Sequence, residues 1–362
     1  MNLHIVPDNT FINAFCDNLG AIGLLKANKI VARTNKSSLI AIKRDIPFAR
    51  LYSRAFEQQV GDTLQYDKVF IHYFSPLLYR WVARHSFREL NWMVWGGDLY
   101  NLPGLDSTCY EPATLEYVRK DRSMDTLLYQ LKVFLGQRPF RKAAYQKVKN
   151  ILTWMQQEYV FACNHLPVKA AHAFFFYENQ QPYQALDSVR NEALENDRLT
   201  ILIGNSGTPS NNHLDAVQFL SDQRIDADLV VPVSYGDQRY IRFLRDNLTY
   251  PHGKVTFVDQ YLPFEAYVKL LASVDAMIMN AVRPLGFGNI LMMLFMNKPV
   301  FLNPRNTSIN ELALSGIKCP QLASMADLLR KGLAIDNRSK VVNLLSHDRL
   351  LTVYSQLFDN AK

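Results

Sequence analysis

The sequence predicts an α/β protein built from two Rossmann-like domains that face each other across a cleft. With 362 residues, the chain is long enough for two domains with separate cores. From Leu199 onward, short apolar runs alternate with helical patterns at the spacing of right-handed βαβ units, which predicts a parallel sheet. The first half of the chain repeats this alternation less regularly, and this repetition predicts the second domain of the pair.

The second domain is expected to span 198–362. Its strands are predicted from short buried apolar runs at 201–203, 229–233, 255–258, 275–279 and 299–302. Helices are predicted between them because apolar residues recur there at three- and four-residue spacing. These helical patterns are Leu214/Val217/Leu220, Ile241/Leu244, Phe264/Tyr267/Leu270/Leu271 and the run 290–296.

The first domain is expected to span 1–185, with the boundary in a polar stretch near 180–198. Strands are predicted at 3–6, 39–42, 68–73, 91–95 and 159–163, with a further apolar run at 174–177 and a helix at 76–85. The section 101–150 lacks strand patterning, so we expect it to be an insertion that contains helices.

Composition and charge limit the function classes. An apolar content of 48% and a charged content of 20% are typical of a globular protein. The net charge of +7 favours an anionic partner: a nucleotide, nucleic acid or an anionic membrane surface. Basic residues do not gather beside aromatics in a recognisable nucleic-acid module, so no nucleic acid is expected.

The spacing of the cysteines and the lengths of the apolar runs indicate the cellular compartment of the protein. The four cysteines are far apart and form no C-x-x-C pair, which favours reduced thiols in a cytoplasmic protein. No signal-peptide pattern opens the chain, and its apolar runs are too short to span a membrane. We therefore expect a cytoplasmic protein, with any membrane contact peripheral and on the inner face of the plasma membrane.

Three loops of the second half follow predicted strands, and ligands of open parallel sheets bind outside the carboxyl ends of the strands. The loop 204–210 contains Gly204 and Gly207, which allow close approach of a ligand, and a Thr-Pro pair that starts a helix. The loop 234–237 offers Tyr235 to stack on a base and Asp237 to cap the next helix. The loop 283–289 places Arg283 beside a glycine-opened helix start, which suits a diphosphate. Each loop alone is an ordinary βα turn, but together they predict nucleotide binding.

Neither a metal nor a cofactor is expected. Asp226-Ala227-Asp228 is similar to a metal-binding D-x-D motif, but it precedes the strand 229–233 and so belongs to the amino edge of the sheet. No other carboxylate or histidine cluster has metal-ligand spacing. The G-x-G at 286–288 lacks a third glycine, and no P-loop is present.

Two residues of the first half are candidates for a general base. Asp98 follows the run Trp92-Met-Val-Trp-Gly-Gly, at the expected carboxyl end of a strand. His72 ends a neighbouring predicted strand. Each residue alone is more often structural, Asp98 as a helix cap and His72 as a hydrogen-bonded side chain, but their joint position favours the catalytic interpretation, with Asp98 the first choice.

The segment 132–154 is rich in basic and aromatic residues. It has two interpretations that the sequence leaves open: a solvated helical face, or an amphipathic surface that meets anionic lipid. Its cations are Arg138, Arg141, Lys142, Lys147 and Lys149, interleaved with Phe134, Leu135, Phe140, Tyr145, Ile151, Leu152 and Trp154.

Two blocks of the chain, Trp95-Gly96-Gly97-Asp98-Leu99-Tyr100 and Gly204-Asn205-Ser206-Gly207, are fairly specific motifs, and through them the chain resembles glycosyltransferase family 56, the 4-alpha-L-fucosyltransferases. Members of this family move 4-acetamido-4,6-dideoxygalactose from a dTDP carrier onto a polyprenyl-linked disaccharide in enterobacterial common antigen assembly. The matching blocks span roughly 70–312 in the order of the family. They are Phe70-Ile71-His72, Trp95-Gly96-Gly97-Asp98-Leu99-Tyr100, Gly204-Asn205-Ser206-Gly207 with Asn212-His213, Val231-Pro232 with Tyr235, Phe264-Glu265-Ala266-Tyr267, Arg283 with Gly286-Phe287-Gly288, and Asn303 with Asn306.

The resemblance implies a GT-B fold, with the donor nucleotide held by the C-terminal domain, the acceptor by the N-terminal domain, and no essential metal. It implies transfer of a deoxysugar, 4-acetamido-4,6-dideoxygalactose or a fucose-like sugar, from a dTDP- or other nucleotide-sugar donor to a lipid-linked glycan in bacterial surface polysaccharide synthesis. A non-catalytic nucleotide-sugar or glycan-binding protein is the alternative, and inversion or retention stays open. The candidate donor-binding residues are Gly204, Asn205, Ser206, Gly207, Asn212, Tyr235, Arg283, Gly286, Phe287, Gly288 and Asn289.

Overall fold

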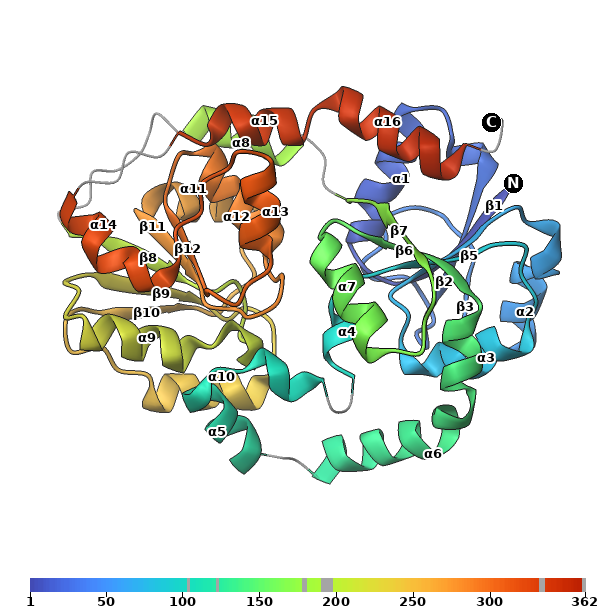
Figure 1. Cartoon of the computed structure of the whole chain (residues 1–362), viewed down its shortest axis with the longest axis horizontal. Helices are drawn as coiled ribbons and strands as arrows, with labels where there is room; N and C mark the ends of the chain where they lie inside the picture. Colours follow the sequence, from blue (N-terminus) through green and yellow to red (C-terminus); the bar gives the residue numbers. More distant parts are fainter. Residues whose placement is uncertain (103–104, 122–123, 178–180, 190–197, 332–335, 360–362) are drawn as a thin grey trace. The chain divides into compact units, whose positions relative to one another are not determined.

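The computed structural model describes residues 1–102, 105–121, 124–177, 181–189, 198–331 and 336–359. The chain forms two compact units, each built around its own sheet (Figure 1). Unit 1 comprises Met1–Pro103, Ser123–Asn179 and His347–Lys362. Unit 2 comprises Gly104–Arg122 and Gln180–Ser346. The expected fold class of two Rossmann-like α/β domains is therefore confirmed.

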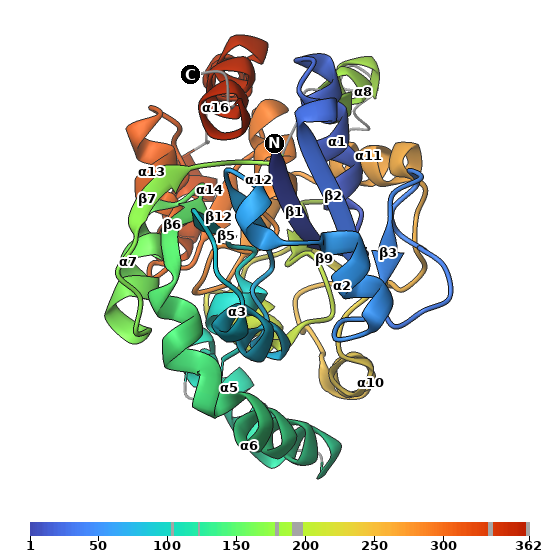
Figure 2. The ribbon, with the colours of Figure 1, turned by 90° about the vertical axis from the view of Figure 1, so that its right-hand side faces the viewer.

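The sheet of unit 1 is parallel throughout, with strand order β3-β2-β1-β4-β5-β6-β7. Figure 2 shows β1 and β2 side by side. The strands are β1 (Asn2–Pro7), β2 (Asn28–Arg33), β3 (Phe48–Ala49), β4 (Val69–His72), β5 (Leu90–Met93), β6 (Val148–Thr153) and β7 (Ala171–Phe174). The helices are α1 (Phe11–Ala21), α2 (Arg54–Val60), α3 (Tyr79–Arg84), α4 (Gly97–Tyr100), α6 (Met124–Gln146), α7 (Gln156–His165) and α16 (His347–Phe358).

The sheet of unit 2 is also parallel, with strand order β10-β9-β8-β11-β12. Its strands are β8 (Thr200–Ile203), β9 (Asp228–Pro232), β10 (Val255–Val258), β11 (Ala276–Met279) and β12 (Val300–Leu302). Its helices are α5 (Pro112–Lys120), α8 (Gln181–Val189), α9 (His213–Asp222), α10 (Gln238–Asn247), α11 (Phe264–Ser273), α12 (Phe287–Phe295), α13 (Ser308–Leu314), α14 (Met325–Lys331) and α15 (Arg338–Leu344).

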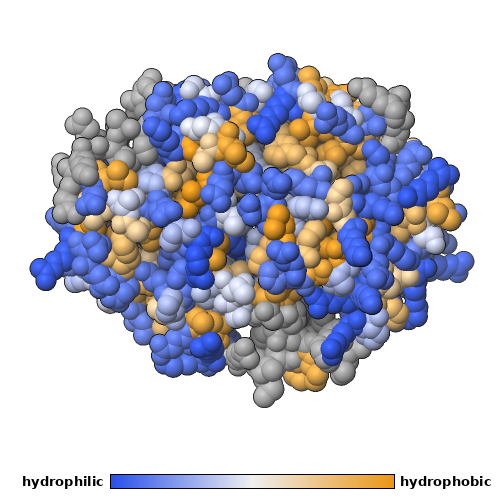
Figure 3. All heavy atoms as spheres, in the orientation of Figure 1, coloured by the Kyte–Doolittle hydropathy of each residue, from blue (hydrophilic) through white to orange (hydrophobic). Residues whose placement is uncertain are grey.

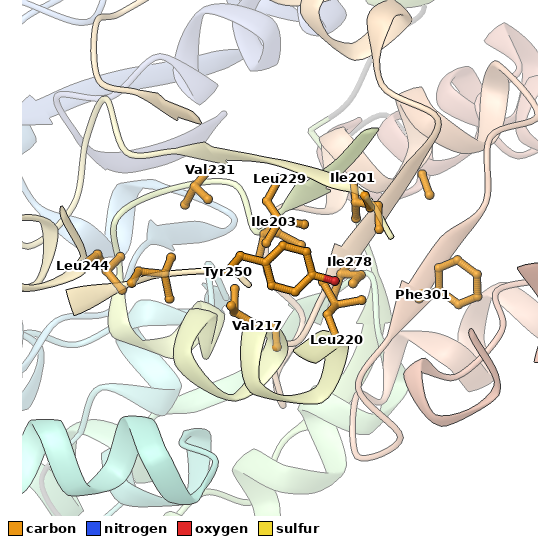
Figure 4. Close-up of a cluster of buried hydrophobic side chains, with 14 of the residues drawn as sticks. Ile201, Ile203, Val217, Leu220, Leu229, Val231, Leu244, Tyr250, Ile278 and Phe301 are labelled. Atoms are coloured by element: carbon orange, nitrogen blue, oxygen red, sulfur yellow. The ribbon is translucent and has the colours of Figure 1, made fainter. Parts of the chain in front are cut away.

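The core of unit 2 joins the sheet to the helix that follows its first strand. Figure 4 shows Val217 and Leu220 of α9 beside the strand residues Ile203 and Ile278, with the ring of Tyr250 among them. Because all these apolar side chains leave water together, the cluster fixes α9 against the sheet. This packing positions the loop between β8 and α9.

The strand and helix pattern of the second half is confirmed by β8 to β12 and α9 to α12, with no end more than three residues from its predicted place. In the first half two strand predictions are wrong. Residues 39–42 form a loop, because the Asp8 carboxylate accepts the backbone N–H groups of Ile40, Ala41 and Ile42 that a strand would need. The run 159–163 lies within α7, because the parallel neighbours β6, which the sequence analysis missed, and β7 require a crossover connection, which this helix provides.

The division of the chain differs from the expected ranges 1–185 and 198–362. Helix α16 packs in the core of unit 1, where Tyr354 and Phe358 are fully buried against Phe15. Residues 105–121 belong to unit 2, although they precede most of unit 2 by many residues. Part of the predicted boundary, 190–197, lies outside the described residues.

Within the described ranges, no helix combines the length and the apolar character that a membrane crossing requires. On the face shown in Figure 3, hydrophilic and hydrophobic residues are intermixed.

Candidate functional site

The strand order of unit 2 reverses between β8 and β11, and such switch points are where ligands of open parallel sheets bind. The loop that follows β8 begins at Gly204, which has a φ of 70°. The loop that follows β11 leads through Arg283 to α12. The sequence-predicted donor residues therefore lie at the expected edge of this sheet.

Asn205 is the polar residue at this switch point. Its Nδ2 donates to the Tyr235 hydroxyl at 3.0 Å, and its backbone N–H donates to Asn211 Oδ1 at 3.2 Å. Within the described residues, Asn205 Oδ1 is buried and has no hydrogen-bond partner. Because a buried carbonyl oxygen without a hydrogen bond lowers the stability of the folded protein, this atom is suited to accept a hydrogen bond from a ligand.

The loop before α12 lies directly against Asn205. A Cβ atom on Gly286, where φ is 61°, would lie 2.9 Å from Asn205 Cγ, so only glycine fits there. Asn289, in the first turn of α12, donates to the Tyr267 hydroxyl at 2.7 Å. A Cβ on Gly288 would meet nothing within 4 Å, so the start of α12 has open space beside it. The structure thus brings Asn205, Tyr235, Gly286 and Asn289 to one edge.

Ser206 and Gly207 hold two loops together. The Gly207 N–H donates to the Tyr235 carbonyl at 2.8 Å, and the Asp237 N–H donates to the Gly207 carbonyl at 3.0 Å. The Ser206 hydroxyl bonds to that of Thr208 at 2.6 Å and accepts from Asn211 Nδ2. The Ser206 side chain is therefore bonded within its own loop, and Gly207 ties this loop to the one that follows β9.

The helix after this loop begins later than expected. A short 3₁₀ turn, Pro209–Asn211, intervenes, and α9 starts at His213 after Asn212 in the left-handed region. Thr208 makes no side-chain cap hydrogen bond. The second loop agrees with expectation, because Asp237 caps α10 by accepting from the N–H groups of Arg239 and Tyr240.

Asn212, a predicted donor residue, is fully buried and hydrogen-bonded inside unit 2. Its Nδ2 donates to the carbonyls of Asn280 at 2.9 Å and Cys109 at 3.2 Å, and its Oδ1 accepts from the Glu111 N–H at 2.9 Å. Its side chain therefore ties residues 105–121 to the sheet. Donor contact by Asn212 stays a prediction, and this geometry leaves it no exposed atom for that role.

Glu111 was missed by the sequence analysis. Its Oε1 accepts from Asn303 Nδ2 at 2.6 Å and from Arg305 Nη2 at 2.7 Å, just beyond the end of β12. The partner Asn303 lies 192 positions away in the chain, so no local pattern indicates the contact. The side chain of Arg283 is buried at the same edge, and its carbonyl accepts from Asn306 Nδ2 at 3.2 Å.

In unit 1, Asp98 is enclosed by donors. Its Oδ2 accepts from Trp92 Nε1 at 2.6 Å and from the Phe74 N–H at 2.8 Å, and its Oδ1 accepts from the Trp95 N–H at 2.9 Å. Burial raises the pKa of Asp98, and these hydrogen bonds oppose the increase. The carboxylate ties the loops after β4 and β5 together, and its catalytic role stays a prediction.

His72 is fully buried at the end of β4. Its Nε2 lies 3.0 Å from His4 Nδ1, and its Nδ1 lies 2.7 Å from the Tyr177 hydroxyl. Burial holds the pKa of His72 well below its ordinary value, and His4 and Arg33 act in the same direction. Both ring nitrogens of His72 are therefore engaged inside unit 1, and its catalytic role stays a prediction.

The segment 132–154 is not one amphipathic surface. Tyr145, Ile151 and Leu152 are buried in unit 1, and residues 148–153 form β6. Lys147 Nζ donates to the carbonyls of Val82, Ala83 and His85 at the end of α3. Among the described side chains of the segment, Arg138, Lys142 and Lys149 are exposed cations. The side chains of 132–136, Phe134 and Leu135 included, lie outside the described residues.

Asp226 and Asp228 lie at the amino edge of the sheet, as predicted, because β9 begins at Asp228. Asp226 pairs with Arg198, and Asp228 Oδ1 accepts from the Lys254 N–H at 2.8 Å. Across the described part of the chain, no three His, Cys, Asp or Glu side chains gather in a way that could hold a metal ion.

The fold is similar to that of several solved enzymes. Sucrose-phosphate synthase from Thermosynechococcus elongatus matches with a TM-score of 0.66 and 12% identity, over 99% of this chain and 98% of that chain. HepE from Anabaena in complex with UDP matches with a TM-score of 0.59 and 12% identity, over 99% and 98%. Trehalose 6-phosphate synthase from Burkholderia multivorans matches with a TM-score of 0.60 and 11% identity, over 99% and 95%. At these identities the likeness shows the fold alone, which is GT-B.

The sequence supplies the assignment that the fold alone does not. The profile of one glycosyltransferase family matches residues 125–348, which covers more than half of the chain and includes every predicted donor loop. The protein therefore belongs to glycosyl transferase group 56, the 4-alpha-L-fucosyltransferase family.

Proposed function

We propose that this glycosyltransferase moves a deoxysugar, 4-acetamido-4,6-dideoxygalactose or a fucose-like sugar, from a dTDP- or other nucleotide-sugar donor. The acceptor is a glycan linked to polyprenyl diphosphate, in bacterial surface polysaccharide synthesis, and the reaction needs no metal ion. Membership in group 56 supports the reaction class. HepE, which shares the fold, is described in complexes with UDP and UDP-glucose, and this supports a nucleotide-sugar donor.

The observation that carries the proposal is the set of groups around Asn205. Its unpaired Oδ1 accepts a hydrogen bond from the nucleotide, and the half-exposed ring of Tyr235 beside it stacks on the base. Within the loop 204–208, the N–H groups of Gly204, Asn205 and Gly207 donate inside unit 2, so the N–H groups of Ser206 and Thr208, with the start of α12, hold the diphosphate, since helix N-termini favour anions. Arg283 stabilises the negative charge that develops on the leaving diphosphate.

In unit 1, the proposal assigns the acceptor proton to Asp98 first and to His72 second. Asp98 is enclosed in this conformation, so the proposal requires the 95–98 loop to shift and expose an oxygen when the acceptor binds. His72 would act through the Tyr177 hydroxyl. Both assignments apply if the anomeric configuration inverts.

The test is a transfer assay with purified protein, dTDP-sugars and a short-chain polyprenyl-diphosphate glycan. Arg283→Ala should lower kcat/KM by about 30- to 1000-fold, equivalent to about 2–4 kcal/mol of transition-state stabilisation. Arg242→Ala, an exposed arginine of α10 in the same unit, is the matched control and should leave kcat/KM unchanged.

Two outcomes would revise the proposal. Activity that is lost in EDTA and restored by Mn²⁺ or Mg²⁺ would contradict the metal-free reaction. Tight nucleotide binding without transfer or donor hydrolysis would identify a non-catalytic nucleotide-sugar or glycan-binding protein instead.

The proposal also includes peripheral contact of the protein with the inner face of the plasma membrane, since the polyprenyl chain of a lipid-linked acceptor is inserted in the bilayer. Exposed Arg138 and Lys142 of α6 are the cations that meet anionic headgroups, each contributing about 1 kcal/mol near the surface. Vesicle binding should rise with anionic lipid and fall when both become Glu. The exposed pair Arg119 and Lys120 on α5, changed to Glu, serves as control. Binding that ignores salt and lipid charge would remove the membrane from the proposal.

A further inference from the structure

Four aromatic side chains follow the carboxyl ends of three neighbouring strands and one edge strand of unit 1. Phe11 follows β1, Tyr73 follows β4, Trp95 follows β5, and Tyr177 follows β7. The strand order of this sheet reverses between β1 and β4, so these rings lie at its switch point. None of the roles assigned above uses the faces of these rings.

The rings form one packed group. Phe11 stacks on Tyr177 with centroids 5.7 Å apart and an interplanar angle of 21°. Trp95 meets Phe11 edge-on at 5.3 Å and Tyr177 edge-on at 5.7 Å. Tyr73 lies 5.9 Å from Trp95. Phe11 is 51% exposed, so the group reaches the surface.

A buried hydrogen-bond chain orients these rings, and its direction can be worked out from Asn28. Asn28 Nδ2 donates to the carbonyls of Leu24 and Phe358, so its Oδ1 must accept from His4 Nε2, at 3.0 Å. Burial lowers the pKa of His4 to about 4, so the ring is neutral and its Nδ1 accepts.

The neutral His4 ring fixes the donor and acceptor roles in the remaining hydrogen bonds. His72 Nε2 donates to His4 Nδ1, so the neutral His72 accepts at Nδ1 from the Tyr177 hydroxyl at 2.7 Å. The Tyr177 oxygen in turn accepts from Trp95 Nε1 at 2.7 Å. The polar atoms of Trp95 and Tyr177 are therefore directed at each other and at His72, and the ring faces are held in one orientation.

A single exposed phenylalanine needs no explanation. Here, however, two buried histidines orient the rings that contact Phe11, at the sheet edge where ligands of open parallel sheets bind. The exposed Phe11 ring, backed by the stacked ring of Tyr177, offers an apolar surface that matches a pyranose ring, whose C–H face is apolar and whose rim carries hydroxyls. A Cβ on Gly97 would lie 3.1 Å from Tyr73 Cε2, so a larger residue would disturb this group.

We propose that Phe11, held by contacts with Trp95 and Tyr177, is a platform on which a pyranose ring of the glycan acceptor stacks. His72 is a positioning residue that fixes Tyr177 and Trp95. The proposal deepens the proposed function by naming the acceptor-binding surface, and it rests on that function for the identity of the ligand as an acceptor.

The test uses saturation-transfer NMR with methyl pyranosides of the gluco, galacto, manno and 2-acetamido-2-deoxygluco series. Wild-type protein should transfer saturation to ring C–H protons of at least one series. Phe11→Leu should weaken this binding by about tenfold, because it removes the ring and keeps the apolar bulk, whereas Phe11→Tyr should retain it. Leu64→Ala, an exposed apolar residue elsewhere in unit 1, is the matched control and should bind like wild type.

The positioning role has its own readout. Tyr177→Phe keeps the ring and removes the hydroxyl that links His72 to Trp95, so pyranoside binding should fall by a smaller factor and the indole N–H signal of Trp95 should shift. An unchanged Trp95 signal would contradict the hydrogen-bond chain.

Failure of this inference and failure of the proposed function differ in their signatures. If Phe11→Leu has an unchanged acceptor KM in the transfer assay and pyranosides bind none of the variants differently, the platform is wrong while transfer stands. If pyranosides bind in a Phe11-dependent way but wild type transfers no sugar, the platform stands and the proposed reaction fails. If geranyl phosphate, and no pyranoside, shows Phe11-dependent saturation, the surface binds the lipid chain and the proposal is overturned.

Discussion

Asp98 accepts three hydrogen bonds from two neighbouring loops and from an indole, all of them inside unit 1. Each donor is an N–H group, so the site is built for an acceptor with no hydrogen of its own. A substitution of Asp98 therefore tests both its structural role and its proposed catalytic role. The structural role is measured by the free energy of unfolding, and the catalytic role by turnover.

Asp98→Asn should reduce the free energy of unfolding of unit 1 by about 1–3 kcal/mol, because an amide N–H group faces N–H donors. It should reduce turnover by about 100-fold and leave dTDP affinity unchanged, because the proposed nucleotide site lies in unit 2. Thermal unfolding, transfer kinetics and nucleotide titration measure the three quantities. Asp62→Asn, an exposed carboxylate that caps one turn, is the control. Normal turnover in Asp98→Asn would leave this residue as a structural cap.

Buried histidines should make the protein sensitive to acid. Burial lowers the pKa of His4 to about 4 and that of His213 to about 3, whereas both titrate near 6.5 when unfolded. Below pH 6.5 the unfolded chain therefore binds protons that the folded chain does not. The stability of each unit should fall as pH falls from 6.5 toward 4, by about 1.4 kcal/mol per pH unit for each histidine.

Urea unfolding at pH 7, 6 and 5 measures this dependence. His213→Gln should flatten it in unit 2, whereas His165→Gln, which changes an exposed histidine, should leave it unchanged. Equal stability at pH 7 and pH 5 would contradict the prediction.

At the scale of elements, the position of α5 is set by its contacts with α9 and α10. The Asp215 carboxylate of α9 accepts from the N–H groups of Ala113 and Thr114 and from the Thr114 hydroxyl, so it caps the first turn of α5 from another helix. Tyr117 of α5 packs on Phe243 with centroids 4.4 Å apart. These contacts hold 105–121 in unit 2 and place Glu111 beside Asn303 and Arg305, just beyond the carboxyl end of β12.

Asp215→Asn should therefore loosen α5 without unfolding the sheet. The expected loss is about 1–2 kcal/mol for the missing cap, which should raise the rate of trypsin cleavage at Arg119 and Lys120 by about tenfold. Asp222→Asn, at the far end of α9, is the control. Equal cleavage rates in the two variants would mean that the apolar contacts alone hold the segment.

At the scale of the whole chain, the last helix completes the first unit. Tyr354 and Phe358 of α16 are fully buried in the unit 1 core, and the Phe358 carbonyl accepts from Asn2 Nδ2 at 2.9 Å. Unit 1 therefore requires residues from both ends of the chain.

Phe358→Ala should destabilise unit 1 by about 3–5 kcal/mol, because it removes a buried aromatic ring. A chain that ends at 346 should lose the cooperative unfolding of unit 1 and keep that of unit 2. Calorimetry resolves the two transitions, with Gln356→Ala, an exposed change on the same helix, as control. A cooperative unit 1 transition in the 1–346 chain would show that α16 is dispensable.

The second half of the chain was predictable because its signals are local. Buried parallel strands are continuous apolar runs, and the helices between them are amphipathic, so β8 to β12 appear in the sequence at nearly their true bounds. Parallel strands share one carboxyl edge, and for that reason the convergence of Asn205, Tyr235 and the 286–289 loop followed from the order of the loops. Two of the family blocks, 204–207 and 286–288, occur in these same loops.

The hydrogen-bond partners of the buried polar side chains, by contrast, were decided by the tertiary structure. The Asn212 side chain is hydrogen-bonded to the backbone of Cys109 and Glu111, which belong to a distant segment. Helix α16, at the end of the chain, packs in the core of unit 1. The chain of His4, His72 and Tyr177 joins residues from β1, β4 and the end of β7. Buried donors and acceptors must find partners wherever packing leaves them, so their pairing depends on tertiary contacts that no run of neighbouring residues encodes.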